Sequence, residues 1–349
     1  MHMADALISP AVGGVMWAAT AGITVLSAGK LKEELDDRKV PLMGVLGAFI
    51  FAAQMINFTI PATGSSGHLG GGMILAILLG PHAAFLTMAS VLAVQALFFA
   101  DGGLLALGCN VFNLGFLPCF VAYPLIYKNL AGEQPSRGRI MAASVVSAVA
   151  GLQFGASAVV LQTWFSGISE LPLSTFLLLM QPIHLAIGIV EGFVTATVVT
   201  FVWKTRPEVL QTAVVEPRAG RDLSLRPLII GFLAVTVITG GILSWFASTH
   251  PDGLEWAMLH TAGKEELESP AGGVHEALGS LQEKVAILPD YGFKSEHEEE
   301  SNAGGESGPR VKTGTSVSGL VGGTFTMVMA ILIGLALKRR AGRGSGGSI

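Results

Sequence analysis

The stretch FLLLMQPIHLAIGIVEGFVTATVVTFVW, residues 176–203, contains a single charged residue, Glu191. A helix rises about 1.5 Å per residue, so a helix of this length exceeds the roughly 30 Å hydrocarbon core of a bilayer. The stretch therefore predicts a membrane-spanning helix. Ionisable groups inside such a helix are costly and are functional candidates by default. Two of them, His184 and Glu191, are seven residues apart and share one face of the helix.

Eight more apolar stretches have the composition of membrane helices. They are residues 11–28, 41–60, 69–79, 82–100, 105–128, 140–163, 227–247 and 319–337. The 349-residue chain is 13% charged, whereas soluble domains carry about 25% charged residues. The predicted fold class is an all-α integral membrane protein, with a seven-helix bundle at residues 1–204, a linker at 205–226 and a two-helix module at 227–349.

The basic residues predict the orientation of these spans, because Lys and Arg are enriched in cytoplasmic loops. With residue 1 outside, 16 of the 21 Lys and Arg residues fall in inside segments, and the other five lie in residues 248–318. This agreement requires an odd number of spans. We therefore interpret Gly80-Pro81 as a turn between a short span and a full one. We expect a multi-pass protein of the cell membrane, with its N-terminus outside and its C-terminus in the cytoplasm.

The outside segment 248–318 connects the two spans of the C-terminal module. It is polar and carries 13 acidic residues against five basic ones. Within it, SEHEEESNAGGESG (residues 295–308) is a low-complexity stretch that we predict to be disordered. The module is therefore expected to hold an acidic extracytoplasmic loop.

The chain opens MHMADALISP, with no Lys or Arg before Lys30 and no cleavage site typical of a signal peptide. We expect this N-terminus to be retained. A bulky second residue, His2, also disfavours removal of Met1. His68 lies in TGSSGHLGGG, a turn that the predicted orientation places on the same outside face.

These outside residues suggest a metal chelator. The α-amine of Met1, the amide nitrogen of His2 and the imidazole of His2 can close two fused chelate rings, and His68 would add a fourth nitrogen. Four nitrogens in a plane suit Ni(II) or Cu(II), whereas zinc prefers a tetrahedron and calcium prefers oxygen ligands. The alternative is that a histidine at position two arises by chance and that His68 is a solvated loop residue.

Other polar groups within residues 1–204 are candidates to support these ligands. They are Asp5, Asn110, Asn113, His184 and Glu191. Two alternatives apply to His184 and Glu191. They could pair with each other in the bundle, or they could act as ligand and base in a membrane metalloenzyme. The sequence lacks an H-E-x-x-H pair, which disfavours the enzyme.

Four features together resemble the CbiM/NikM family, the substrate-capture components of energy-coupling factor importers for nickel and cobalt. They are the Met-His start with its nearby acid, TGSSGHLGGG, CNVFNLG (residues 109–115) and HLAIGIVEG (residues 184–192). The usual opening of the family, Met-His-Ile-Pro-Asp-Gly, is present here without its Pro and Gly. The resemblance covers residues 1 to about 204. It implies that Met1, His2 and His68 bind Ni(II), or alternatively Co(II), as the transported substrate.

The segment STHPDGLEWAM (residues 248–258) resembles the PDGLE signature of NikN-type accessory subunits, which favours nickel over cobalt. We expect a turn at Pro251-Asp252-Gly253 rather than a metal ligand at His250, and a capture site that is complete without this module. The sequence has no P-loop motif and is not expected to hydrolyse ATP. The resemblance instead implies a transmembrane coupling subunit (EcfT type) and ATPase subunits (EcfA type) as partners in the lipid bilayer. No enzymatic activity, nucleic-acid partner or organic cofactor is expected.

Overall fold

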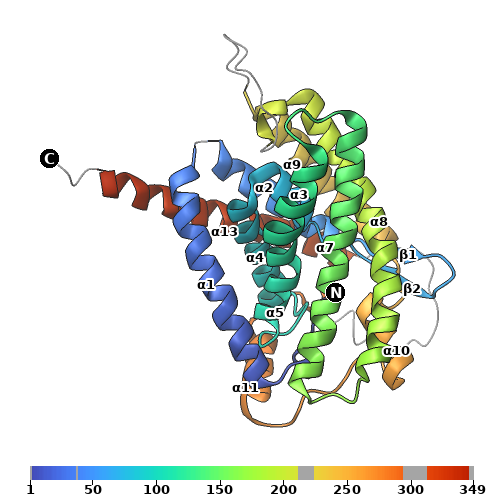
Figure 1. Ribbon diagram of the computed structural model, residues 1–349. Coiled ribbons are helices and arrows are strands. Elements are labelled where there is room, and N and C mark those ends of the chain that lie inside the picture. The colour runs from blue at the N-terminus through green and yellow to red at the C-terminus, as the bar shows by residue number, and fades with distance from the viewer. Residues whose placement is uncertain (1, 37, 211–223, 294–312, 346–349) are drawn as a thin grey trace.

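The computed structural model describes residues 2–36, 38–210, 224–293 and 313–345. In this part of the chain, six helices are long and apolar enough to cross a membrane, and two shorter apolar helices accompany them. Figure 1 shows the helices gathered into one bundle, with α10 and α11 at its lower end. The predicted class, an all-α integral membrane protein, is confirmed.

The first seven predicted spans correspond to helices in the same order. They are α1 (Pro10–Glu34), α2 (Lys39–Gln54), α3 (Gly72–Leu79), α4 (Pro81–Phe98), a continuous helix over Leu107–Ala131, α7 (Arg137–Ser166) and α8 (Leu173–Thr205). The last two are α9 (Arg226–Gly241) and α13 (Thr313–Ser345). Short 3-10 turns are η1 (Asp5–Leu7), η3 (Pro207–Val209), η4 (Leu243–Phe246) and η5 (Pro289–Tyr291).

Local sequence explains where several helices begin. Ser9 caps α1 by accepting a hydrogen bond from the N–H of Val12, and Pro10 follows at the first helical position, where its missing N–H costs nothing. Ser136 caps α7 in the same way, through the N–H of Arg139. These two caps fix the residues at which α1 and α7 begin.

The predicted span 41–60 is too long, because α2 ends at Gln54. The chain then forms strand β1 (Phe58–Ile60), which pairs antiparallel with β2 (Ser65–Gly67). The connecting residues include Pro61 and Gly64, the latter at φ +72°, and both residue types favour turns. Turn chemistry here outweighs the apolar composition of the stretch.

The predicted span 69–79 is also shorter than expected. Helix α3 has eight residues, about 12 Å in length, which does not cross a hydrocarbon core of about 30 Å. Gly71 and Gly80, at φ +76° and +80°, bound it at its two ends. All eight residues are buried, so α3 is enclosed by its neighbours instead of facing lipid.

The fifth helix combines α5 (Leu107–Val111), η2 (Phe112–Tyr127) and α6 (Lys128–Ala131). Its middle part, η2, is a π-helix that contains Pro118 and Pro124. Proline lacks the N–H that α-helical bonding requires, and π-helical segments are rare and frequent at functional sites. The predicted span 105–128 thus has the right position but not regular α-helical geometry.

The C-terminal module packs alongside the bundle. Both α9 and α13 contact α2, and a Cβ atom at Gly319 of α13 would lie 2.5 Å from the carbonyl oxygen of Gly240 in α9. Glycine at both positions lets these two helices approach closely. The acidic loop contains two helices that the sequence analysis did not predict, α10 (Gly253–Ala262) and α11 (Gly273–Val285). The stretch 295–308 and most of the linker 205–226 lie outside the described residues.

Candidate metal centre

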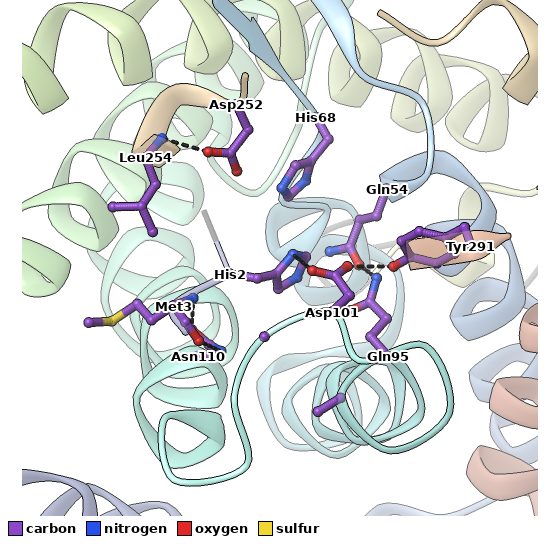
Figure 2. Close-up of polar contacts among 12 residues, drawn as sticks. His2, Met3, Gln54, His68, Gln95, Asp101, Asn110, Asp252, Leu254 and Tyr291 are labelled. Atoms are coloured by element: carbon purple, nitrogen blue, oxygen red, sulfur yellow. Dashed lines mark hydrogen bonds and ion pairs between the residues drawn. The ribbon is translucent and has the colours of Figure 1, made fainter. Parts of the chain in front are cut away.

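The N-terminal segment runs into the bundle, and Met3 has no solvent exposure. The backbone N–H of Met3 donates to Oδ1 of Asn110 at 2.8 Å. In return, Nδ2 of Asn110 donates to the carbonyl of Met3 at 3.2 Å. One amide side chain therefore satisfies both polar groups of a buried backbone unit. This pairing fixes the position of the preceding residue, His2 (Figure 2).

Asp5 holds the same segment from another side. Its Oδ1 accepts a hydrogen bond from the N–H of Ala106 at 2.9 Å, and the N–H of Gly103 donates to the carbonyl of Met3 at 2.9 Å. A Cβ atom at Gly103 would lie 1.8 Å from the carboxylate of Asp5, so only glycine permits this contact. Burial raises the pKa of the Asp5 carboxyl. Asp5 thus ties the N-terminal segment to the residues just before α5 through its contact with Ala106.

The segment brings the imidazole of His2 against that of His68. The ring centroids are 5.0 Å apart, and the ring planes differ by 4°. Both side chains are largely buried, with exposed fractions of 7% for the His2 side chain and 8% for His68. Burial lowers the pKa of the His68 imidazole to about 3. The ring is therefore neutral near pH 7, which is the form that binds metals.

Glu191 fixes the backbone that follows His68. Its Oε2 accepts from the N–H of Gly70 at 2.7 Å and its Oε1 from the N–H of Gly71 at 3.1 Å. Gln54 adds a third contact, because its Nε2 donates to the carbonyl of Gly70 at 2.8 Å. Glu191 is thus a buried acceptor for the turn that presents His68.

His184, on α8, lies near His68. Its Nδ1 is 2.8 Å from the carbonyl oxygen of Met180, and its buried Nε2 has no hydrogen-bond partner in the described part of the chain. Together with His68 and Asp252 it lines a cavity of about 10 Å³, close to the space of one water molecule. Among the described contacts, His184 bonds Met180 and Glu191 bonds the turn after His68, so the alternative of a pair between His184 and Glu191 gains no support.

Asn113 is less directly connected to the histidines. Its amide exchanges two hydrogen bonds with the amide of Gln162, at 2.9 and 3.0 Å, and so links η2 to α7. Its Nδ2 also lies 3.7 Å from Sδ of Met3. Asn113 therefore contacts the side chain of Met3, whereas Asn110 bonds the backbone of Met3.

The sequence analysis missed Asp101 and Tyr291. Oδ1 of Asp101 is 3.1 Å from Nδ1 of His2, and its Oδ2 accepts a hydrogen bond from the hydroxyl of Tyr291 (Figure 2). Burial alone would raise the pKa of the Asp101 carboxyl, but the neighbouring His2 imidazole holds it well below its usual range. No sequence pattern indicated this contact, because Tyr291 belongs to the C-terminal module and follows Asp101 by 190 positions.

The PDGLE motif also reaches the histidines. Instead of forming only a turn, it starts helix α10: Asp252 accepts from the N–H groups of Leu254 and Glu255, and the Glu255 carboxylate accepts from the N–H of Asp252. This reciprocal arrangement is a capping box, and the D-x-x-E spacing could have revealed it. The carbonyl of Pro251 accepts from the N–H of Ser66 at 2.8 Å, which docks the motif beside His68. His250 is exposed.

The described side chains do not form a metal site by themselves. Among them, no three His, Cys, Asp or Glu residues are close enough together to hold a metal ion. A site at His2 and His68 would thus need further donors, such as backbone nitrogens. Met1, the predicted source of the amine, lies outside the described residues. The fold and this arrangement define a multi-pass membrane protein with a buried histidine pair beside its N-terminal segment.

Comparison with known proteins assigns the family. Residues 2–209 match CbiM, the cobalt uptake substrate-specific transmembrane region, and residues 226–339 match the PDGLE domain. The chain belongs to the CbiM family and carries a PDGLE domain after the CbiM region. The predicted resemblance to this family is confirmed.

Relatives match both regions. The putative fused nickel transport protein NikMN of Archaeoglobus fulgidus is 30% identical over 98% of this chain and 99% of its own length. The fused nickel transport protein NikMN of Rhodobacter capsulatus is 31% identical over 83% of this chain and 88% of its own. A crystal structure of a truncated transition metal transporter matches 59% of this chain and 99% of its own, with a TM-score of 0.53 and 31% identity. Because these relatives are transport proteins, the chain is a transporter component rather than an enzyme.

Proposed function

We propose that this protein captures Ni(II) from the extracytoplasmic side as the substrate-specific component of an ATP-driven importer. The ligands are the α-amine of Met1, the amide and imidazole nitrogens of His2, and the imidazole of His68. The observation that carries this proposal is the stacked pair of buried imidazoles at 5.0 Å. Both side chains are largely buried, with exposed fractions of 7% for His2 and 8% for His68, so the pair is shielded from solvent.

The donor set favours nickel over cobalt as the transported substrate. Four nitrogens in a plane suit Ni(II), and carboxylate oxygens, which harder cations prefer, are not among the proposed ligands. The naming of the Archaeoglobus fulgidus and Rhodobacter capsulatus relatives as fused nickel transport proteins supports the same choice. Import of Co(II) by the same site is the alternative.

Transport requires partners, because the sequence has no P-loop. Membership of the CbiM family supports assembly with a transmembrane coupling subunit (EcfT type) and ATPase subunits (EcfA type). The distribution of Lys and Arg supports an outside N-terminus. In this proposal residues 1–204 capture the metal, residues 205–226 are a cytoplasmic linker, and residues 227–349 form an accessory module.

The test is to add one residue before Met1. The extra residue turns the amine of Met1 into a peptide nitrogen and moves the free amine one residue further from His2, so Met1 no longer supplies the amine of the proposed ligand set. We expect purified extended protein to lose nickel binding while keeping its thermal stability. A matched control carries the same added residue at the C-terminus and should bind nickel as the wild type does. Wild-type affinity in the N-terminally extended protein would contradict the proposed ligand set.

A further inference from the structure

The accessory module contacts the loop after α4 through its residues 282–291. The backbone N–H of Ile287 donates to the carbonyl of Phe98 at 3.0 Å, and the N–H of Asp290 donates to the carbonyl of Phe99 at 2.9 Å. The side chain of Gln282 donates to the carbonyls of Ala96 and Gly102, at 2.9 and 2.8 Å. The module thus bonds the backbone on both sides of Asp101.

Tyr291 lies at the centre of this contact. Its ring stacks on Phe99, with a centroid distance of 5.2 Å and an angle of 20° between the planes, and meets Phe51 edge-on at 6.2 Å. The aromatic packing leaves the hydroxyl to donate to Oδ2 of Asp101, as Figure 2 shows. The other oxygen, Oδ1, faces Nδ1 of His2. One carboxylate therefore bridges the module and the candidate ligand.

The backbone around this bridge is unusual. Four non-glycine residues in the described part of the chain have positive φ. Three of them flank the bridge: Ala100 at +55°, Asp290 at +48° and Tyr291 at +60°. Left-handed conformations are unfavourable for residues with a Cβ atom. Because the surrounding contacts hold all three in this conformation, the positions of Asp101 and Tyr291 are tightly determined.

The bridge involves the ring nitrogen that a chelate would use. A metal bound to the amide nitrogen of His2 closes a six-membered ring only through Nδ1 of the same residue, because Nε2 is on the far side of the imidazole. Nδ1 is the nitrogen that lies 3.1 Å from Asp101. The metal and the carboxylate therefore compete for one atom.

We propose that Asp101, anchored by Tyr291, is a positioning residue that holds the His2 imidazole in a resting orientation and must release it before metal binds. This inference rests on the proposed function, since it takes His2 as a ligand. It assigns the accessory module a role without making it a ligand donor: through Tyr291 the module lowers the affinity of the site. A site that holds its metal less tightly releases it more readily for transport.

The proposal predicts that substitutions at Asp101 and Tyr291 raise the affinity for nickel. In Asp101→Asn the charge-assisted contact with Nδ1 becomes a weaker neutral one, so nickel should bind roughly three- to tenfold more tightly. The Asp101 side chain is 23% exposed, so the substitution also removes the attraction of a partly buried carboxylate for the cation, which acts in the opposite direction. The proposal requires the release of Nδ1 to be the larger of the two effects. Tyr291→Phe keeps the aromatic packing and removes only the hydroxyl. It should tighten binding by a smaller factor.

The experiment measures nickel affinity by titration of the purified full-length protein in lipid nanodiscs, with nickel chloride as the probe. It uses wild type, both single variants and the double variant. Because Tyr291 acts through Asp101, Tyr291→Phe should change nothing further in the Asp101→Asn background. Tyr123→Phe is the matched control, since it removes a buried hydroxyl for which the described residues offer no hydrogen-bond partner. The visible spectrum of bound nickel should be the same in all variants, because Asp101 is not a ligand.

The outcomes are separable. Tighter binding cannot arise from a damaged fold, so a gain of affinity with an unchanged spectrum supports the proposal. Unchanged or weaker binding in both single variants, additive effects in the double variant, or an altered nickel spectrum in Asp101→Asn would each overturn it. A wild-type protein that binds no nickel contradicts the proposed function itself, and this inference with it.

Discussion

The carboxylate of Glu191, in the middle of α8, accepts hydrogen bonds from the backbone N–H groups of Gly70 and Gly71, at 2.7 and 3.1 Å. Glu191 is 2% exposed, and a buried carboxylate requires such donors to offset its desolvation. A membrane helix thereby fixes the turn that presents His68. This contact explains a charged residue inside an otherwise apolar span without assigning it catalysis.

We expect Glu191→Gln to weaken nickel binding roughly tenfold, a typical loss for a residue that orients a metal ligand. A Gln side chain has one carbonyl oxygen, so one of the two N–H groups would face an NH2 group instead of an acceptor. Isothermal titration of the purified protein measures the effect. Glu170→Gln, at an exposed position between α7 and α8, is the matched control. Equal affinity in Glu191→Gln and wild type would refute this supporting role.

The two histidines should not contribute equally. His68→Ala leaves three of the four proposed nitrogens, so we expect weaker but measurable nickel binding. In His2→Ala the site loses an imidazole and one of the two fused chelate rings, so we expect almost no binding. Titration of both variants under the same conditions gives the ranking. A larger loss for His68→Ala would show that the N-terminal chelate is not the main source of affinity.

Much of the fold could be predicted from sequence, because hydropathy averaged along one segment reports whether that segment lies in a membrane. The long apolar run at 176–203 predicted α8 (Leu173–Thr205) closely. The hairpin of β1 and β2 could not be predicted in this way, since β1 (FTI) has the apolar content of a helix end and β2 (SSG) has the composition of a turn. Nor does hydropathy distinguish a spanning helix from the short, enclosed helix α3.

The candidate site, like the fold, could be predicted from the sequence only in part. His2 and His68 could be singled out because their residue types at an N-terminus and in a glycine-rich turn suggest metal chemistry. The structure brings the two rings together. Asp101 and Tyr291 could not be singled out, because their contact depends on how the accessory module docks on the loop after α4. Asp252 is an intermediate case: the capping box is visible in the sequence, but its place beside His68 is not.

Asn110 should be required for a well-ordered N-terminus. Asn110→Ala leaves the N–H of Met3 without its partner, while the carbonyl of Met3 keeps the hydrogen bond from Gly103. An unsatisfied buried group costs about 1–3 kcal/mol. We therefore expect nickel affinity to fall at least roughly tenfold. Thermal unfolding, measured in parallel, separates this effect from global damage. Asn129→Ala is the control, because its exposed side chain donates to the carbonyl of Leu125, one turn away on the same helix. Unchanged nickel affinity in Asn110→Ala would show that the Met3 contact is dispensable.

The docking of the PDGLE motif should control how quickly metal leaves the site. A Cβ atom at Gly253 would lie 2.7 Å from Cγ2 of Ile183 and 3.1 Å from Cε1 of His184, so Gly253→Val overpacks the contact between α10 and α8. Overpacking costs about 1–3 kcal/mol, enough to displace the motif roughly tenfold more often while its capping box keeps α10 folded. We expect bound nickel to be lost to an external chelator correspondingly faster, as followed by stopped-flow absorbance. Gly279→Val in α11 is the control, because a Cβ atom there meets no atom within 4 Å. If the two variants lose nickel at the same rate, the seated motif does not cover the route by which the metal leaves.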